Sequence, residues 1–308
     1  MEVSIDDIVL RAWAYLSRVS DGPCSELVEL ARRVGPVEAA ERVRKGEITE
    51  GLAAATDARR HTDHAAEDLA ALERCGGRLI VRDDDEWPSQ AFAVLDGEPG
   101  ETGVQWVPPL ALWAIGPARV DEITRRAVAV VGTRAATSYG EHLAADMAGG
   151  LTGAGVAVVA GGAYGIDGAA HRAALAADGT AVAVLAGGVD VAYPAGHAAL
   201  LNRIGDRGLL VTEFAPGVRP TRYRFAARGR LVAALSSATV VVEAGARSGA
   251  LNTACWARQL GRPVAAVPGP VTSAASAGCH ALLRDGVLLA AGPRDVLDLL
   301  GPGGPTSG

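Results

Sequence analysis

The chain has 308 residues, of which 49% are hydrophobic and 4% aromatic, and its formal net charge is −6. This length allows two domains, and the Ala-, Val-, Leu- and Gly-rich composition is typical of an α/β core. No apolar run reaches 18 residues without glycine or charge, and the acidic N-terminus lacks signal-peptide features, so we expect neither a transmembrane helix nor a secretory leader. The four cysteines are scattered and form no C-x-x-C pair, so we expect reduced thiols and a cytoplasmic protein.

The net charge hides an asymmetry along the chain. Residues 1–125 carry 24 acidic and 14 basic side chains, whereas residues 126–308 carry 11 acidic and 15 basic ones. A basic C-terminal part with clustered arginines is typical of a protein that binds a phosphate-bearing ligand. Lys45 is the only lysine, so a general preference for arginine explains the residue type but not the clustering.

The N-terminal part predicts a helical module. Residues 4–60 contain several short helical stretches, with breaks near residues 21–25 and 34–38. An acidic helical module more often packs or recruits a partner than performs chemistry. His61 and His64 form an H-x-x-H pair without a third ligand, which favours a surface pair over a metal site.

Residues 77–83 (GRLIVRD) predict a strand, and residues 108–116 form a second apolar run. Residues 95–103 predict a surface loop between them.

From residue 126 onward, short runs of Val and Ala that end in glycine alternate with amphipathic stretches. The apolar runs predict strands buried on both faces, and the stretches at 140–155 and 168–178 are long enough for crossover helices. We therefore predict an α/β fold with a doubly wound, mainly parallel sheet. The predicted strands are AVAVVG (127–132), VAVVAGG (156–162), AVAVLAGG (181–188), LLVTE (209–213), ATVVVEAG (238–245), PVAAVPG (263–269) and VLLAAG (287–292).

Two glycine turns follow the first two of these strands, where ligands of such sheets bind. In the turn at 130–140, Gly132 leads into a helix whose N-terminus can hold phosphate, and Arg134 adds a bidentate donor; a plain strand-to-helix turn is the alternative. The turn at 161–171 lacks the lysine of a P-loop and does not fit G-x-G-x-x-G, which argues against ATP hydrolysis and against a dinucleotide. In that turn, Asp167 and His171 favour a helix cap paired with a surface histidine over a catalytic pair.

The stretch RPTRYRFAARGR (219–230) holds five arginines, and no Asp or Glu occurs between Glu213 and Glu243. It precedes a buried strand, so we expect a long loop and a helix start at the ligand-binding edge. Guanidinium groups for phosphates beside aromatic rings for bases are typical of proteins that bind single-stranded nucleic acid. A solvated arginine face is the alternative.

Two further turns are candidates for the same edge. In residues 240–257, Ser248 and Gly249 open a helix, and Glu243 with Arg247 could serve hydrolysis or brace the loop. In residues 268–286 a Ser/Gly turn precedes a helix that carries His280.

Together these segments resemble the DNA-processing protein A family, also called DprA or Smf. The family's core contains V-G-[ST]-R, S-G-x-A-x-G-I-D-x-x-A-H, Y-P, S-E-x-P-x-G, F-P-x-R-N-R and S-G-[SA]-L-x-T-A in that order. The matching segments keep this order: VGTR (131–134), AGGAYGIDGAAH (160–171), YP (193–194), TEFAPG (212–217), FAARGR (225–230) and SGALNTA (248–254).

The resemblance implies an extended Rossmann-like domain over residues 66–300 and an N-terminal SAM-like helical module over residues 1–65. It also implies a homodimer that binds and protects single-stranded DNA and loads the RecA recombinase during natural transformation (competence), with no catalysis, cofactor or metal. We expect a disordered tail at 301–308 and no C-terminal winged helix. The family pattern carries over to these DNA-contacting residues: Arg134, Gly161, Gly162, Phe225, Arg228, Arg230, Ser248 and Gly249.

The chain also departs from the family pattern. Tyr164 stands where the family usually has an arginine. The family's last motif, P-G…G-x-N-x-L-I…G-A, matches residues 268–286, and His280 replaces its asparagine. F-P-x-R-N-R has become F-A-A-R-G-R, so we expect Arg222 and Arg224 to supply additional positive charge. With Gly132, these residues complete the predicted site.

Two other functions are consistent with the same fold class. One is a nucleotide-binding enzyme of the phosphoribohydrolase (lysine-decarboxylase-like) type, although the P-G-G-x-G-T-x-x-E signature of that family is absent. The other is a nucleotide-sensing protein without a role on DNA.

Overall fold

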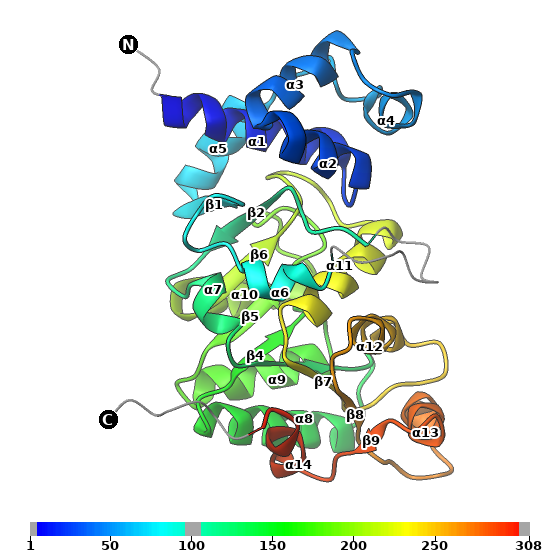
Figure 1. The fold of residues 1–308 in the computed structure, drawn as a ribbon. Coiled ribbons are helices and arrows are strands. Elements are labelled where there is room, and N and C mark those ends of the chain that lie inside the picture. The colour runs from blue at the N-terminus through cyan, green and yellow to red at the C-terminus, as the bar shows by residue number, and fades with distance from the viewer. Residues whose placement is uncertain (1–4, 96–105, 302–308) are drawn as a thin grey trace. The chain divides into compact units, whose positions relative to one another are not determined.

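The computed structural model describes residues 5–95 and 106–301 (Figure 1). The chain divides into two compact units, neither of which is continuous in sequence. The first unit is Met1–Ile115 with Ala186–Val191 and Val211–Ala227, and the second is Gly116–Leu185 with Ala192–Leu210 and Arg228–Gly308. The first unit thus extends beyond the predicted module of residues 1–65. Residues 302–308 of the predicted tail and residues 96–103 of the predicted loop lie outside the described residues.

The first unit begins with five helices: α1 (Ile5–Ser20), α2 (Ser25–Val34), α3 (Pro36–Lys45), α4 (Glu50–Thr56) and α5 (Ala65–Arg74). The breaks follow from local chemistry. Asp21 takes a left-handed conformation (φ 53°) directly after α1, and Gly35 (φ 81°) separates α2 from α3, whose first residue is proline. Thr49 caps α4 by accepting a hydrogen bond from Leu52 N at 3.2 Å.

The first unit also contains an antiparallel strand pair. The strands β1 (Gly77–Val81) and β2 (Ala111–Ile115) pair in register from Gly77 with Ile115 to Val81 with Ala111, and the short helix α6 (Ser89–Ala93) lies between them in sequence. Trp113 of β2 is fully buried among apolar side chains of the helices, Tyr15, Leu16 and Leu27 included.

The second unit is built on a parallel sheet, as predicted. Its strands lie in the order β5-β4-β3-β7-β8-β9, and every neighbouring pair is parallel. Another strand, β6 (Leu209–Thr212), begins in the second unit and ends in the first. The six strands are β3 (Ala127–Val131), β4 (Ala157–Ala160), β5 (Ala181–Val184), β7 (Ala238–Val241), β8 (Val264–Ala266) and β9 (Leu288–Leu289).

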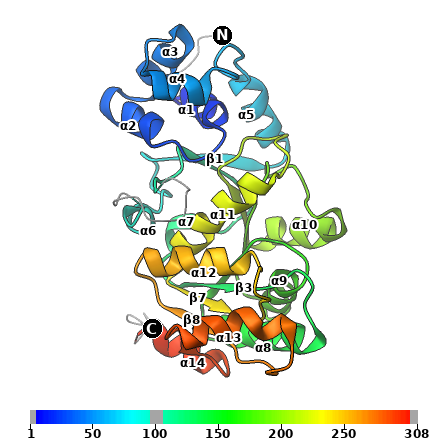
Figure 2. The ribbon, with the colours of Figure 1, turned by 90° about the vertical axis from the view of Figure 1, so that its right-hand side faces the viewer.

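Helices cover both faces of this sheet. The strand order runs one way from β3 to β5 and the other way from β7 to β9, so right-handed crossovers place their helices on opposite faces. Figure 1 shows α8 and α9 on one side of β7 and β8 and α12 and α13 on the other, and in Figure 2 α12 and α13 face the viewer. The sheet is therefore doubly wound. The unit's complete helices are α7 (Val120–Ile123), α8 (Ser138–Gly153), α9 (Ile166–Ala176), α10 (Ala198–Arg207), α12 (Ala250–Gln259), α13 (Ala277–Arg284) and α14 (Pro293–Leu299), and α11 (Arg222–Ala234) enters it after Ala227.

Burial of the strands follows the prediction at the centre of the sheet but not at its edge. All residues of β3, β4, β5 and β7 are buried. In β9, however, Leu288 and Leu289 are 51% and 55% exposed. The prediction of two buried faces was wrong for this strand, because it has two residues and stands last in the sheet order. Within residues 5–95 and 106–301, no helix is both long and apolar enough to cross a membrane.

The contrast between a buried strand residue and an exposed one gives a matched stability test. Leu209 in β6 is 0% exposed, so Leu209→Ala should lower the free energy of unfolding by about 2–5 kcal/mol. The same change at Leu289 should cost no more than about 0.5 kcal/mol. Urea unfolding measures both, and equal losses would contradict the exposed position of β9.

Candidate functional site

The carboxyl ends of the parallel strands in the second unit bring the predicted turns to one edge. Gly132 follows β3 and packs so closely that a Cβ there would lie 2.7 Å from the carbonyl oxygen of Glu243, which follows β7. Only glycine fits this approach. The first predicted turn is thereby fixed against the end of β7.

Arg228 lies across the ends of two neighbouring strands of this edge. A Cβ on Gly161, the residue after β4, would fall 1.4 Å from Nη1 of Arg228. The same nitrogen donates a hydrogen bond to the carbonyl oxygen of Val184, the last residue of β5, at 3.2 Å. The guanidinium is partly buried, and it can lie there because residue 161 has no side chain.

Asp167 supplies a buried negative charge that stabilises the charged form of this arginine. Its carboxylate is buried and accepts hydrogen bonds from Gly161 N at 3.0 Å and Ala163 N at 3.3 Å. Burial raises the pKa of Asp167, and the charges of Arg228 and Arg134 oppose that rise. Burial likewise lowers the pKa of Arg228, and Asp167 opposes that fall. Asp167 therefore fixes the turn before α9 and balances the arginine, and the prediction that it caps a helix was wrong.

His171, one turn further along α9, is fully buried, so the predicted surface histidine was also wrong. Neither ring nitrogen has a hydrogen-bond partner among the described residues. Burial lowers the pKa of His171 to about 3, and the neighbouring charges of His197, Arg228 and Arg172 lower it further. The imidazole is therefore neutral at neutral pH and fills space beneath the site.

Tyr164 presents an aromatic ring at the rim of the same turn. The ring is 45% exposed, packs edge-on against His197 with 4.7 Å between ring centroids, and its hydroxyl accepts from Gly196 N at 3.2 Å. His197 Nδ1 lies 3.1 Å from the carbonyl oxygen of Gly162. Because a carbonyl can only accept, this nitrogen carries the proton. These contacts hold the Tyr164 ring in place, and part of that ring remains exposed to solvent.

The remaining predicted residues of the second unit occupy other loops of that edge. Arg134 is exposed in the loop after β3. Gly249 is exposed at the start of α12, and the hydroxyl of Ser248 accepts from Ala250 N at 3.4 Å. His280 is partly buried, with Nε2 3.0 Å from the carbonyl oxygen of Gly269.

The arginine-rich stretch is more helical than predicted. Four of its five arginines lie in α11, which begins at Arg222, and Arg219 alone among the five precedes the helix. Arg230 is fully buried, so its guanidinium is not presented to a ligand. Arg222, Arg224 and Phe225 form the first turn of α11 and belong to the first unit. Of these, Arg222 is exposed and Phe225 is partly buried.

Glu243 braces the site rather than facing a ligand. Its buried carboxylate accepts hydrogen bonds from Thr137 N at 2.8 Å and Thr137 Oγ1 at 2.7 Å. Thr137 in turn caps α8 by accepting from Gly140 N at 3.2 Å. Of the two roles that the sequence left open for Glu243, these contacts correspond to the bracing one.

The described residues contain no cluster of three or more His, Cys, Asp or Glu side chains placed to hold a metal ion. His61 and His64 are both exposed.

Comparisons with known proteins agree on one family. Residues 78–301 match the family model of the DNA recombination-mediator protein A. The chain is 62% identical over 302 residues to a putative DNA processing protein DprA of Mycobacterium tuberculosis, which covers 98% of this chain and 78% of that protein.

Two solved structures are similar over most of their length. The X-ray structure of DNA processing protein A from Streptococcus pneumoniae superposes with a TM-score of 0.76 at 28% identity and covers 97% of this chain and 98% of that one. A structure of DNA processing protein A from Helicobacter pylori, which describes that protein's single-stranded DNA binding mode, has a TM-score of 0.61 at 25% identity. It covers 73% of this chain and 95% of that one.

The buried histidine predicts a pH dependence of stability. In the folded protein the pKa of His171 is about 3, below its ordinary 6.5. Between these two pH values the unfolded chain binds a proton at this residue and the folded protein does not. Above pH 6.5 the imidazole is neutral in both states, and His171 does not lower the free energy of unfolding. As the pH falls from 6.5 toward 3, only the unfolded chain takes up the proton, and the free energy of unfolding decreases. Between pH 7 and pH 5 the loss should be about 2 kcal/mol.

Urea unfolding at pH 7 and pH 5 measures this loss. In His171→Gln the difference between the two pH values should shrink by that amount, and an unchanged difference would contradict the neutral, buried imidazole.

Proposed function

This chain belongs to the DNA recombination-mediator protein A family, and we propose that it is a recombination mediator that binds single-stranded DNA. The observation that carries the proposal is the guanidinium of Arg228 lying against Gly161 and the end of β5. A cation held at a glycine turn beside a helix N-terminus suits a phosphate. The H. pylori relative, a protein described as binding single-stranded DNA, supports the same ligand.

The neighbouring residues supply what a single strand requires. Arg134 adds a second exposed guanidinium on the loop after β3, and the exposed ring of Tyr164 offers a surface on which a base can stack. Phosphate contacts with stacking, and without hydrogen bonds to base edges, bind a strand without reading its sequence. Gly132, Gly162, Ser248, Gly249 and His280 shape the loops around these groups. In the first unit, Arg222 and Phe225 are separate candidates for contact with the strand.

We extend the proposal to the protein's partners. The bound strand would be protected and passed to the RecA recombinase during DNA uptake, in the cytoplasm and by a homodimer. The family description as a recombination mediator supports this role. No cofactor is required for it.

We propose that the protein acts without catalysis. An acid or base for nucleotide hydrolysis must reach the reacting atoms, but Asp167 and Glu243 are both buried and hydrogen-bonded to their own loops. Release of base from a nucleoside monophosphate that Glu243→Gln abolished would support the phosphoribohydrolase alternative instead. Saturation with a mononucleotide, with no binding of oligonucleotides, would favour the nucleotide sensor.

Fluorescence anisotropy with a labelled poly-dT oligonucleotide at two salt concentrations tests the central claim, with a matching duplex as control. We expect salt-sensitive binding that prefers the single strand, because bound phosphates release counterions. Arg228→Ala should weaken binding at low salt by about tenfold and reduce the slope of log K against log salt by about 0.7. Binding that Arg228→Ala leaves unchanged would overturn the assignment of the site.

A pair of glycine substitutions tests whether the position of the Arg228 guanidinium, and not the stability of the fold, determines binding of poly-dT. Gly161→Ala places a methyl where Nη1 of Arg228 lies, so the arginine must move and binding of poly-dT should weaken about as much as in Arg228→Ala. Gly149→Ala adds the same methyl on α8 where no atom lies within 4 Å, and its binding should equal that of the unaltered protein. Anisotropy measures both, and equal affinities for the two variants would contradict the account.

A further inference from the structure

The first unit presents two arginines of the arginine-rich stretch to solvent. Arg219 and Arg222 are exposed, and within residues 5–95 and 106–301 neither guanidinium has a hydrogen bond or an ion pair. Tyr223, the residue after Arg222, is 50% exposed, and its ring lies 3.3 Å from where a Cβ on Gly22 would stand. Exposed cations without a compensating carboxylate, beside an exposed aromatic ring, suit a phosphate-bearing ligand.

Arg224, in contrast, is fully engaged with the protein itself. Its Nε and Nη2 donate to Oδ1 of Asp21 at 3.1 and 2.5 Å, and its guanidinium lies 5.6 Å from the ring centroid of Phe214. Its Nη1 donates to the backbone carbonyl oxygen of Arg219 at 2.5 Å. Arg224 was predicted to bind the ligand, but these contacts show that its guanidinium holds the backbone of Arg219.

The anchor of this contact is Asp21, at the end of the first helix of the N-terminal module. Its backbone has a φ of 53°, which turns the chain out of α1, and its other carboxylate oxygen lies 3.6 Å from Nη1 of Arg59. Arg59 is itself tied to the end of α1, because its Nε donates to the carbonyl oxygen of Val19 at 3.0 Å. Asp21 is thus fixed from two sides before it meets Arg224.

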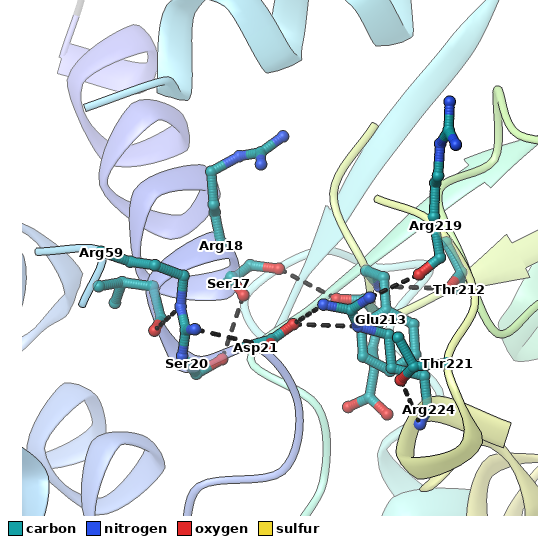
Figure 3. A network of polar contacts seen from close by, with 12 residues as sticks. Ser17, Arg18, Ser20, Asp21, Arg59, Thr212, Glu213, Arg219, Thr221 and Arg224 are labelled. Carbon is teal, nitrogen blue, oxygen red and sulfur yellow. Dashed lines mark hydrogen bonds and ion pairs between the residues drawn. The ribbon is translucent and has the colours of Figure 1, made fainter. Parts of the chain in front are cut away.

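Other residues of α1 hold the same segment at earlier points. Ser17 Oγ donates to the carbonyl oxygen of Glu213 at 3.2 Å, and Arg18 Nη2 donates to that of Pro216 at 2.7 Å. Figure 3 shows Ser17, Asp21 and Arg224 joined in one network, with the side chain of Arg219 directed away from it. The network therefore holds the backbone of this segment and leaves the guanidinium of Arg219 open to solvent.

We propose that Arg219 binds a backbone phosphate of the single strand, and that the N-terminal helical module positions it through Asp21 and Arg224. The inference rests on the proposed function and adds one contact and one positioning device to it. Asp21 and Arg224 are positioning residues, since neither faces the ligand. Because the backbone of Arg219 is already fixed, binding costs less conformational entropy than it would for an arginine on a free segment.

Arg219→Ala tests the contact. In poly-dT anisotropy, we expect affinity at low salt to fall about fivefold and the slope of log K against log salt to fall by about 0.7, the loss of one phosphate contact. The control is Arg33→Ala, which removes an exposed arginine from α2 and should leave the slope unchanged. Equal slopes for Arg219→Ala and the unaltered protein would overturn the proposal.

Asp21→Asn tests the positioning role, because the two possible roles of Asp21 predict opposite changes in the affinity for poly-dT. If Asp21 merely repelled DNA, removing its charge would strengthen binding. If it positions Arg219, the same change should weaken binding about threefold, although the protein has become less negative. Asparagine tolerates the left-handed backbone at residue 21, so the turn is preserved, and thermal unfolding checks that it is.

The double variant shows whether Asp21 acts through Arg219. In the Arg219→Ala protein, Asp21→Asn should have no further effect on affinity, because residues that act as a unit are not additive. Glu47→Gln removes an equal, exposed charge elsewhere in the module and should leave binding within error of the unaltered protein. Stronger binding in Asp21→Asn, or a full additional loss in the double variant, would overturn the positioning role.

The outcomes also separate this inference from the function on which it rests. If the unaltered protein does not bind poly-dT at low salt, the proposed function fails, and the inference fails with it. If the protein binds and Arg228→Ala weakens binding while Arg219→Ala does not, the function stands and only the inference fails.

Discussion

The proposed site depends on one close approach, that of a guanidinium to a residue without a side chain. Arg228 lies where a Cβ of Gly161 would be and reaches the last carbonyl of β5. The buried carboxylate of Asp167 fixes the glycine turn through its amides and offsets part of the arginine's desolvation. The edge of a parallel sheet, which by itself offers only backbone groups, thereby holds a fixed positive charge in a partly buried place.

Much of this could be predicted from the sequence, because the signals are local. Val- and Ala-rich runs that end in glycine predicted the strands of the second unit, and the breaks near Asp21 and Gly35 predicted the helix ends. The turn glycines and Arg134 were expected at the carboxyl edge, and Gly132 and Gly161 lie there. The exposure of β9 was missed, since its apolar residues do not reveal that it is the last strand of the sheet.

What the sequence could not provide was the partner of each arginine. Within the stretch at 219–230 no carboxylate is near in sequence, so Arg222, Arg224, Arg228 and Arg230 were all candidates for the ligand. The fold brings Asp21 to Arg224 across 203 residues, gives Arg228 the charge of Asp167, and buries Arg230 completely. These long-range contacts divide one cluster into arginines that serve the fold and arginines that remain available.

Photo-crosslinking a single strand that carries 5-iodo-deoxyuridine tests the location of the strand most directly. Adducts form where a base stacks on an aromatic ring, so mass spectrometry of the bound complex should find them at Tyr164, which is 45% exposed beside the Arg228 turn. Adducts at Tyr164 that disappear in Arg228→Ala would establish the account. Bound strand whose adducts all lie outside residues 132–165 and 219–230 would contradict it.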